Sequence, residues 1–166
     1  MSNKTTMGEL FELAITVEKA AEELYRGLEA KFVHHREVAN FLGEYAAEEA
    51  GHAKQLESLR DTLSPEQLSA PADFQMPQDA HRILQSPVGK VLKGIKNLEE
   101  AYQLVHELED SETNAILEFL ITDFSMDRKA QYFLRVQLKE HIGRIMTEFP
   151  ARFGDTASRL VVEALE

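Results

Sequence analysis

Apolar residues recur at three- and four-residue steps through four long stretches of the chain, and this spacing limits the possible folds more than any other feature. The spacing places apolar side chains on one face of an α-helix, and it predicts amphipathic helices over about residues 6–31, 36–63, 88–109 and 113–149. No segment alternates apolar and polar residues convincingly at every second position, so we expect no β-sheet. The sequence therefore predicts an all-α fold.

The connections between the predicted helices differ greatly in length. Ser64 followed by Pro65 predicts that the second helix ends there and that a short capped turn begins. Residues 64–88 contain four prolines, which predict a long connection with one short helix near residues 79–85. Such a connection inside a compact domain is explained when it crosses the length of a helix bundle. We therefore expect a four-helix bundle of two hairpins, joined by a long crossover between its second and third helices.

The chain of 166 residues fits a single domain, residues 1–166. Pro150 ends the fourth predicted helix, and a glycine-containing turn follows it. A short C-terminal helix is then expected to start near Asp155 or Thr156.

A weak internal repeat relates the two predicted hairpins. "VEKA" at residues 17–20 resembles "LEEA" at residues 98–101, and "FLGEYAAEEAGHAKQL" at 41–56 aligns without gaps with "FLITDFSMDRKAQYFL" at 119–134. This alignment pairs Glu18 with Glu99 and Glu49 with Asp127. The repeat therefore predicts that the two hairpins carry carboxylates at equivalent positions.

Composition excludes several kinds of site. The chain has no cysteine, which excludes disulfides, zinc ribbons, rubredoxin-type iron sites and thiol nucleophiles. Its net charge is −11 with no basic stripe, which argues against nucleic-acid binding. The first residues contain no long apolar run, so we expect no signal peptide, no membrane span and a cytoplasmic location.

Polar residues interrupt the apolar stripe of the second predicted helix in "EYAAEEAGHAKQL", residues 44–56. Glu49 and His52 are three residues apart, which on a helix means about 60° of rotation and about 4.5 Å of rise, so both can reach one point. A Glu-x-x-His pair joined by a glutamate from a neighbouring helix is the arrangement that binds two iron or two manganese ions in a bundle core. Glu18, on the inward side of the first helix, is the candidate glutamate.

The second hairpin offers further candidate ligands. Glu99 is the counterpart of Glu18, and Asp127 lies on the apolar stripe of the fourth helix, where an unpaired carboxylate is costly. Gln131, one turn further, could pair with Asp127 in place of a metal ion. For each glutamate, the alternative to metal binding is a position exposed to solvent. Tyr25, two turns after Glu18, either hydrogen-bonds a ligand or packs in the core. The predicted metal ligands are Glu18, Glu49, His52, Glu99 and Asp127.

These motifs resemble those of the rubrerythrin-type members of the ferritin-like superfamily. The resemblance rests on "VEKAAEELY", "EEAGH" and, more weakly, "LEEA", and it extends over about residues 7–147. It implies a ferritin-like bundle with two iron ions between the hairpins, each hairpin giving a glutamate and a Glu-x-x-His motif. It also implies catalytic roles for Glu18, Glu49 and His52 in peroxide reduction or ferrous iron oxidation, and association as a homodimer.

The second hairpin departs from the pattern of this family. Asp127 stands where the family has glutamate, and Ala130 stands where it has histidine. An alternative alignment places Asp123 opposite Glu49 and Met126 at the histidine position, again without an imidazole. The cysteines of a rubredoxin-like domain are absent as well, so electrons would come from a separate donor.

The residues leave three functions open. The first is a protein that binds iron or manganese and cycles the ions between ferrous and ferric forms. The second is a degenerate bundle that has lost its metal site and serves as a structural or interaction module. The third is a site on the first hairpin alone for one ion, zinc included. Because binding requires deprotonated carboxylates and a neutral imidazole, affinity is expected to fall below about pH 5.

Overall fold

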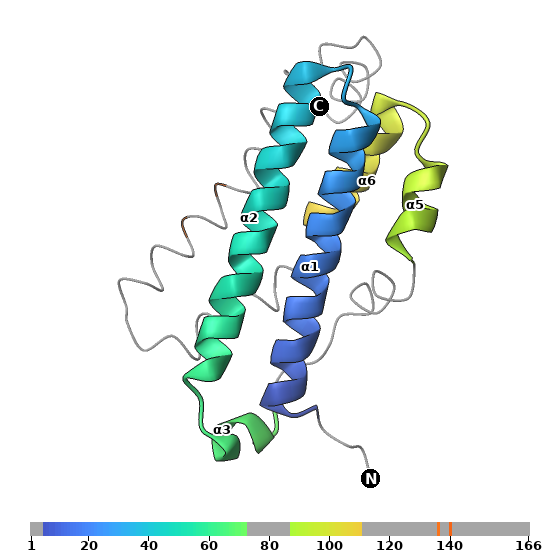
Figure 1. Ribbon diagram of the computed structural model, residues 1–166. Coiled ribbons are helices and arrows are strands. Elements are labelled where there is room, and N and C mark those ends of the chain that lie inside the picture. Colours follow the sequence, from blue (N-terminus) through green and yellow to red (C-terminus); the bar gives the residue numbers. More distant parts are fainter. Residues whose placement is uncertain (1–4, 73–86, 111–135, 137–139, 141–166) are drawn as a thin grey trace.

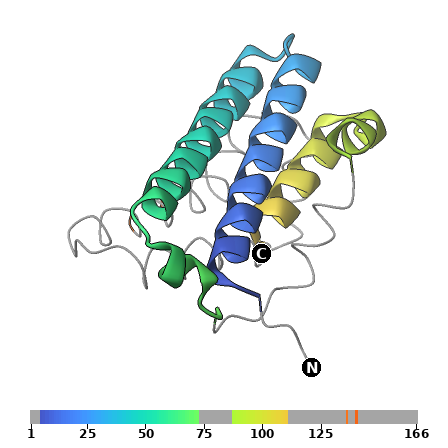
Figure 2. The ribbon, with the colours of Figure 1, turned by 60° about the horizontal axis from the view of Figure 1, so that its bottom comes forward.

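The computed structural model describes residues 5–72, 87–110, 136 and 140. Within these residues the chain forms five helices and no strand, which confirms the all-α prediction for this part of the chain. The helices are α1 (Met7–Lys31), α2 (Arg36–Asp61), α3 (Pro65–Ser69), α5 (Val88–Gly94) and α6 (Leu98–Asp110). Helices α1 and α2 lie antiparallel and side by side, with α5 and α6 on the other side of α1 (Figures 1 and 2).

A capping box fixes the start of α1. The Glu9 N–H donates to the Thr6 hydroxyl at 3.2 Å, and the Thr6 N–H donates to the Glu9 carboxylate at 2.8 Å. The helix ends at Lys31, and the turn of residues 32–35 leads into α2. The bounds of both helices agree with the sequence prediction to within two residues.

The turn predicted at Ser64 is the short helix α3. The Gln67 N–H donates to the Ser64 hydroxyl and the Ser64 N–H donates to the Gln67 side chain, while Pro65 occupies the first helical position. The chain then returns to the start of α1, where the Ala72 N–H donates to the Thr5 carbonyl at 2.8 Å. The two ends of the α1–α2 hairpin are therefore tied together by backbone hydrogen bonds.

The third predicted helix is divided in two, so the prediction of one helix over about residues 88–109 is wrong at residues 95–97. The Glu100 N–H donates to the Asn97 side chain at 2.8 Å, and the Lys96 N–H donates to the Glu100 carboxylate at 2.7 Å. These side chains satisfy backbone groups that a continuous helix would have used, and they begin α6 as a new helix.

Helix α5 packs closely against α1 at Gly27. A Cβ atom at this position would lie 2.2 Å from a methyl carbon of Leu92, a distance at which atoms overlap. The Lys31 ammonium group donates to the Leu92 carbonyl beside this contact. An alanine at position 27 would therefore require the Leu92 side chain to shift.

The core consists of two apolar clusters that follow each other along α1 and α2. The lower cluster, near α3 in Figure 1, contains Met7, Leu10, Phe11, Ala14, Ile15, Leu56 and Ala72. The upper cluster contains Ala21, Leu24, Tyr25, Leu28, Phe32, Val38, Phe41, Leu42, Tyr45, Ala46, Ile95, Leu98, Ala101, Tyr102 and Val105. Helix α6 and the segment before it contribute to the upper cluster only, whereas α1 and α2 contribute to both.

Several predicted elements lie outside the described residues. They are most of the crossover, the short helix near residues 79–85, the C-terminal helix and the fourth helix, in which only Val136 and Glu140 are described, both as helical. The ferritin-like bundle therefore stays a prediction. Among the described residues, we found no helix with the length and apolar character needed to cross a bilayer.

Candidate metal centre

Three charged side chains lie buried between the lower and upper clusters. Glu18 is 5% exposed, Glu49 is 5% exposed and His52 is 9% exposed. The other side chains buried in the described part of the chain are hydrophobic. Because an isolated charge in an apolar interior costs several kcal/mol, these three groups must stabilise one another or a bound cation.

The three side chains face one another across the α1–α2 interface. The Nδ1 atom of His52 lies 3.6 Å from a carboxylate oxygen of Glu18 and 3.5 Å from a carboxylate oxygen of Glu49. One ligand atom from each residue lies within 4.8 Å of the other two. The group can therefore hold a metal ion.

Local helix geometry places these side chains at one level. Glu49 and His52 are three residues apart on α2, so they lie on the same face, and antiparallel packing brings Glu18 of α1 opposite them. Buried alanines occupy neighbouring positions one turn away, among them Ala21, Ala46 and Ala53.

Burial and mutual contact shift the proton affinities of the group. Burial, together with the neighbouring charge of Glu49, raises the pKa of the Glu18 carboxyl well above its usual value of 4.5. Burial alone would lower the pKa of His52, but hydrogen bonds to both carboxylates and their charges raise it from 6.5 to about 9. A proton on His52 thus compensates negative charge of the two carboxylates when no cation is bound.

The donor set fits a divalent transition metal. Two carboxylate oxygens and one imidazole nitrogen are ligands that suit iron, manganese and zinc. Three protein ligands leave further coordination positions open for water or a small substrate, as in catalytic metal sites. The two carboxylates also supply the negative charge that a divalent cation needs in an apolar core.

Of the remaining predicted metal ligands, only Glu99 lies within the described residues, and it is not part of this group. Glu99 is half-buried in the first turn of α6 and does not belong to the set of ligand atoms within 4.8 Å. Asp127 lies outside the described residues. Tyr25 is fully buried in the upper cluster, with its ring centroid 5.7 Å from that of Tyr45.

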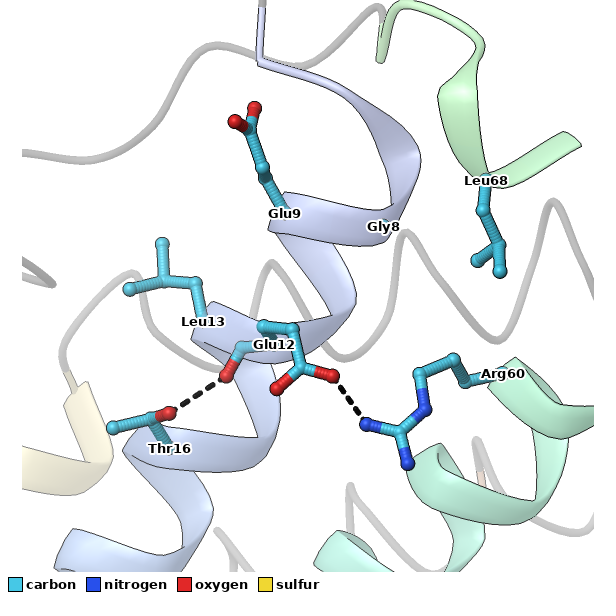
Figure 3. A pocket seen from close by; sticks show the side chains of 7 residues that line it. All are labelled: Gly8, Glu9, Glu12, Leu13, Thr16, Arg60 and Leu68. Carbon is cyan, nitrogen blue, oxygen red and sulfur yellow. Dashed lines mark hydrogen bonds and ion pairs between the residues drawn. The ribbon is translucent and has the colours of Figure 1, made fainter. Parts of the chain in front are cut away.

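The pocket drawn in Figure 3 was not predicted from the sequence. It is lined by Gly8, Glu9, Glu12, Leu13, Thr16, Arg60 and Leu68, which come from α1, α2 and α3. Arg60 forms an ion pair with Glu12, and the Thr16 hydroxyl donates to the Glu12 carbonyl at 2.7 Å. None of these lining residues belongs to the buried charged group, and the sequence carries no motif that marks them.

Comparisons of the chain with protein-family models, with curated proteins and with solved structures found no match.

Proposed function

We propose that this protein is a ferritin-like, rubrerythrin-type metal protein that reduces peroxide or oxidises ferrous iron. In this proposal Glu18, Glu49 and His52 bind iron or manganese, and Glu99 and Asp127 complete a site for two ions. The observation that supports it most directly is the buried group of two carboxylates and one imidazole between α1 and α2. The resemblance of "VEKAAEELY" and "EEAGH" to the family motifs supports the redox chemistry.

Each residue of the group has a task in this function. The Glu18 and Glu49 carboxylates bind the cation and compensate its charge. His52 gives up its proton when the cation arrives and presents a neutral nitrogen. The two apolar clusters exclude bulk water from the site. The bound ions supply Lewis acidity and electrons, and a separate donor protein returns the electrons.

An anaerobic titration with ferrous iron, followed by addition of peroxide, tests this function. The wild-type protein is expected to bind iron and to show the absorbance of ferric iron after peroxide is added. The variants Glu49→Gln and His52→Gln are expected to lose both responses. Glu57→Gln and His35→Gln are matched controls, because these residues lie at the surface on α2 and in the turn before it and should change neither response.

Metal analysis of protein purified without chelator separates this function from a structural role. Bound iron or manganese supports the proposal. Absence of bound metal, together with no iron uptake in the titration, would support a degenerate bundle that serves as an interaction module. The observation that favours this second function is that Ala130 stands where the family has histidine.

A further inference from the structure

We infer that the α1–α2 hairpin holds a complete three-ligand site for one metal ion, and that this first ion binds without Glu99 or Asp127. The inference rests on the proposed metal binding, but it concerns the order in which the site is filled. Glu18 comes from α1, and Glu49 and His52 come from α2, so one hairpin supplies all three donors of the buried group.

The distances within the group suit a single ion. Ligand atoms around a tetrahedral zinc ion, at bond lengths of about 2.0–2.2 Å, lie about 3.4 Å from one another. The Nδ1 atom of His52 lies 3.5 Å and 3.6 Å from its two carboxylate neighbours. The two distances from His52 therefore already match those around one ion, and the ligand oxygens of Glu18 and Glu49 lie within 4.8 Å of each other.

The hairpin keeps these donors in place by its own contacts. Above the group, α1 and α2 pack together in the upper cluster, and below it they pack in the lower cluster, to which α5 and α6 contribute nothing. Lys19, next to Glu18, forms an ion pair with Glu57 of α2 at 2.8 Å, and Arg60 pairs with Glu12 one turn further along α2. The two clusters thus hold the donors from both directions along the helices, whereas the two ion pairs lie at the surface and contribute little.

The second hairpin offers a poorer set of donors. Glu99 lies in the first turn of α6, is only half-buried and does not belong to the set of ligand atoms within 4.8 Å. In the aligned repeat, Ala130 stands at the position equivalent to His52, so the repeat supplies no imidazole there. A second ion is therefore expected to bind more weakly than the first.

Titration of the full-length protein with Co²⁺ tests this order, because the visible spectrum of Co²⁺ reports the ligands and geometry of the ion. The double variant with Glu99→Gln and Asp127→Asn should bind the first equivalent with the wild-type spectrum. Its dissociation constant should stay within about threefold of the wild-type value, whereas His52→Gln should weaken binding by at least about tenfold. Glu57→Gln is the surface control, and circular dichroism checks that each variant remains helical.

The outcomes are distinct. Loss of the first equivalent in the double variant, or a changed spectrum, would overturn the inference, because the first ion would then be shared between the hairpins; the proposed metal binding would stand. Two ions that bind to the wild-type protein in a single step would overturn it as well. A wild-type protein that binds neither Co²⁺ nor Mn²⁺ would overturn the proposed function together with the inference.

Discussion

Binding of a metal ion should release the proton that His52 carries in the metal-free protein. The pKa of this imidazole is raised to about 9, because two buried carboxylates surround its Nδ1 atom. A solution at pH 7 is about two pH units below this pKa, so nearly every molecule carries the proton on His52. Competition with this proton weakens metal binding about a hundredfold. The apparent affinity for Mn²⁺ should therefore rise about tenfold per pH unit between pH 6 and pH 8.

Calorimetric titration with Mn²⁺ in two buffers of different ionisation enthalpy measures the number of released protons. We expect about one proton from His52 at pH 7. His52→Asn should lose most of the Mn²⁺ binding, whereas His35→Asn, at an exposed position, should leave both the affinity and the number of released protons unchanged. An affinity that does not change between pH 6 and pH 8 would refute the reasoning.

Three further predictions concern stability. Glu18→Gln should abolish the rise in melting temperature that Mn²⁺ causes, because it removes one of the three ligands of the buried group. A rise equal to that of the wild-type protein would contradict this. As the pH rises from 6.5 through 9, the free energy of unfolding of the metal-free protein should fall by at most on the order of 3 kcal/mol, measured by urea denaturation. The reason is that a raised pKa of His52 stabilises the fold only while the imidazole is protonated. An equal fall in His52→Gln would argue against this cause. Gly51→Ala should stabilise the protein by about 1 kcal/mol, since a Cβ there meets no described atom within 4 Å. Gly27→Ala should be less stable than Gly51→Ala, since its Cβ overlaps Leu92 and the Leu92 side chain must shift. Equal melting temperatures would show that this shift has no cost.

Local rules explain why part of this structure was predictable. Thr6 with Glu9 and Ser64 with Gln67 are capping pairs that act within four residues, so the sequence marks these helix starts correctly. The spacing of Glu49 and His52 likewise fixes their common face before any tertiary contact is known. Glu18 could be added because the apolar stripe of α1 identifies its buried side.

The periodicity of apolar residues did not predict two features. Ile95 and Leu98 keep a three-residue apolar step, so the pattern continues across residues 95–97 although the backbone does not. The cap that Asn97 and Glu100 form outweighs the pattern there. The pKa of His52 was also missed, because it depends on a carboxylate from another helix; the expected loss of affinity below about pH 5 therefore moves to higher pH.

The charged side chains between the two apolar clusters also set the register in which α1 and α2 pack. Apolar side chains recur at three- and four-residue steps through α1 and α2, so a slide of one turn, about 5.4 Å, would still bring apolar side chains together. Such a slide would separate Glu18 from His52 and leave each of them facing hydrocarbon. The same three side chains that could bind a cation thus select one pairing of the helices over its neighbours.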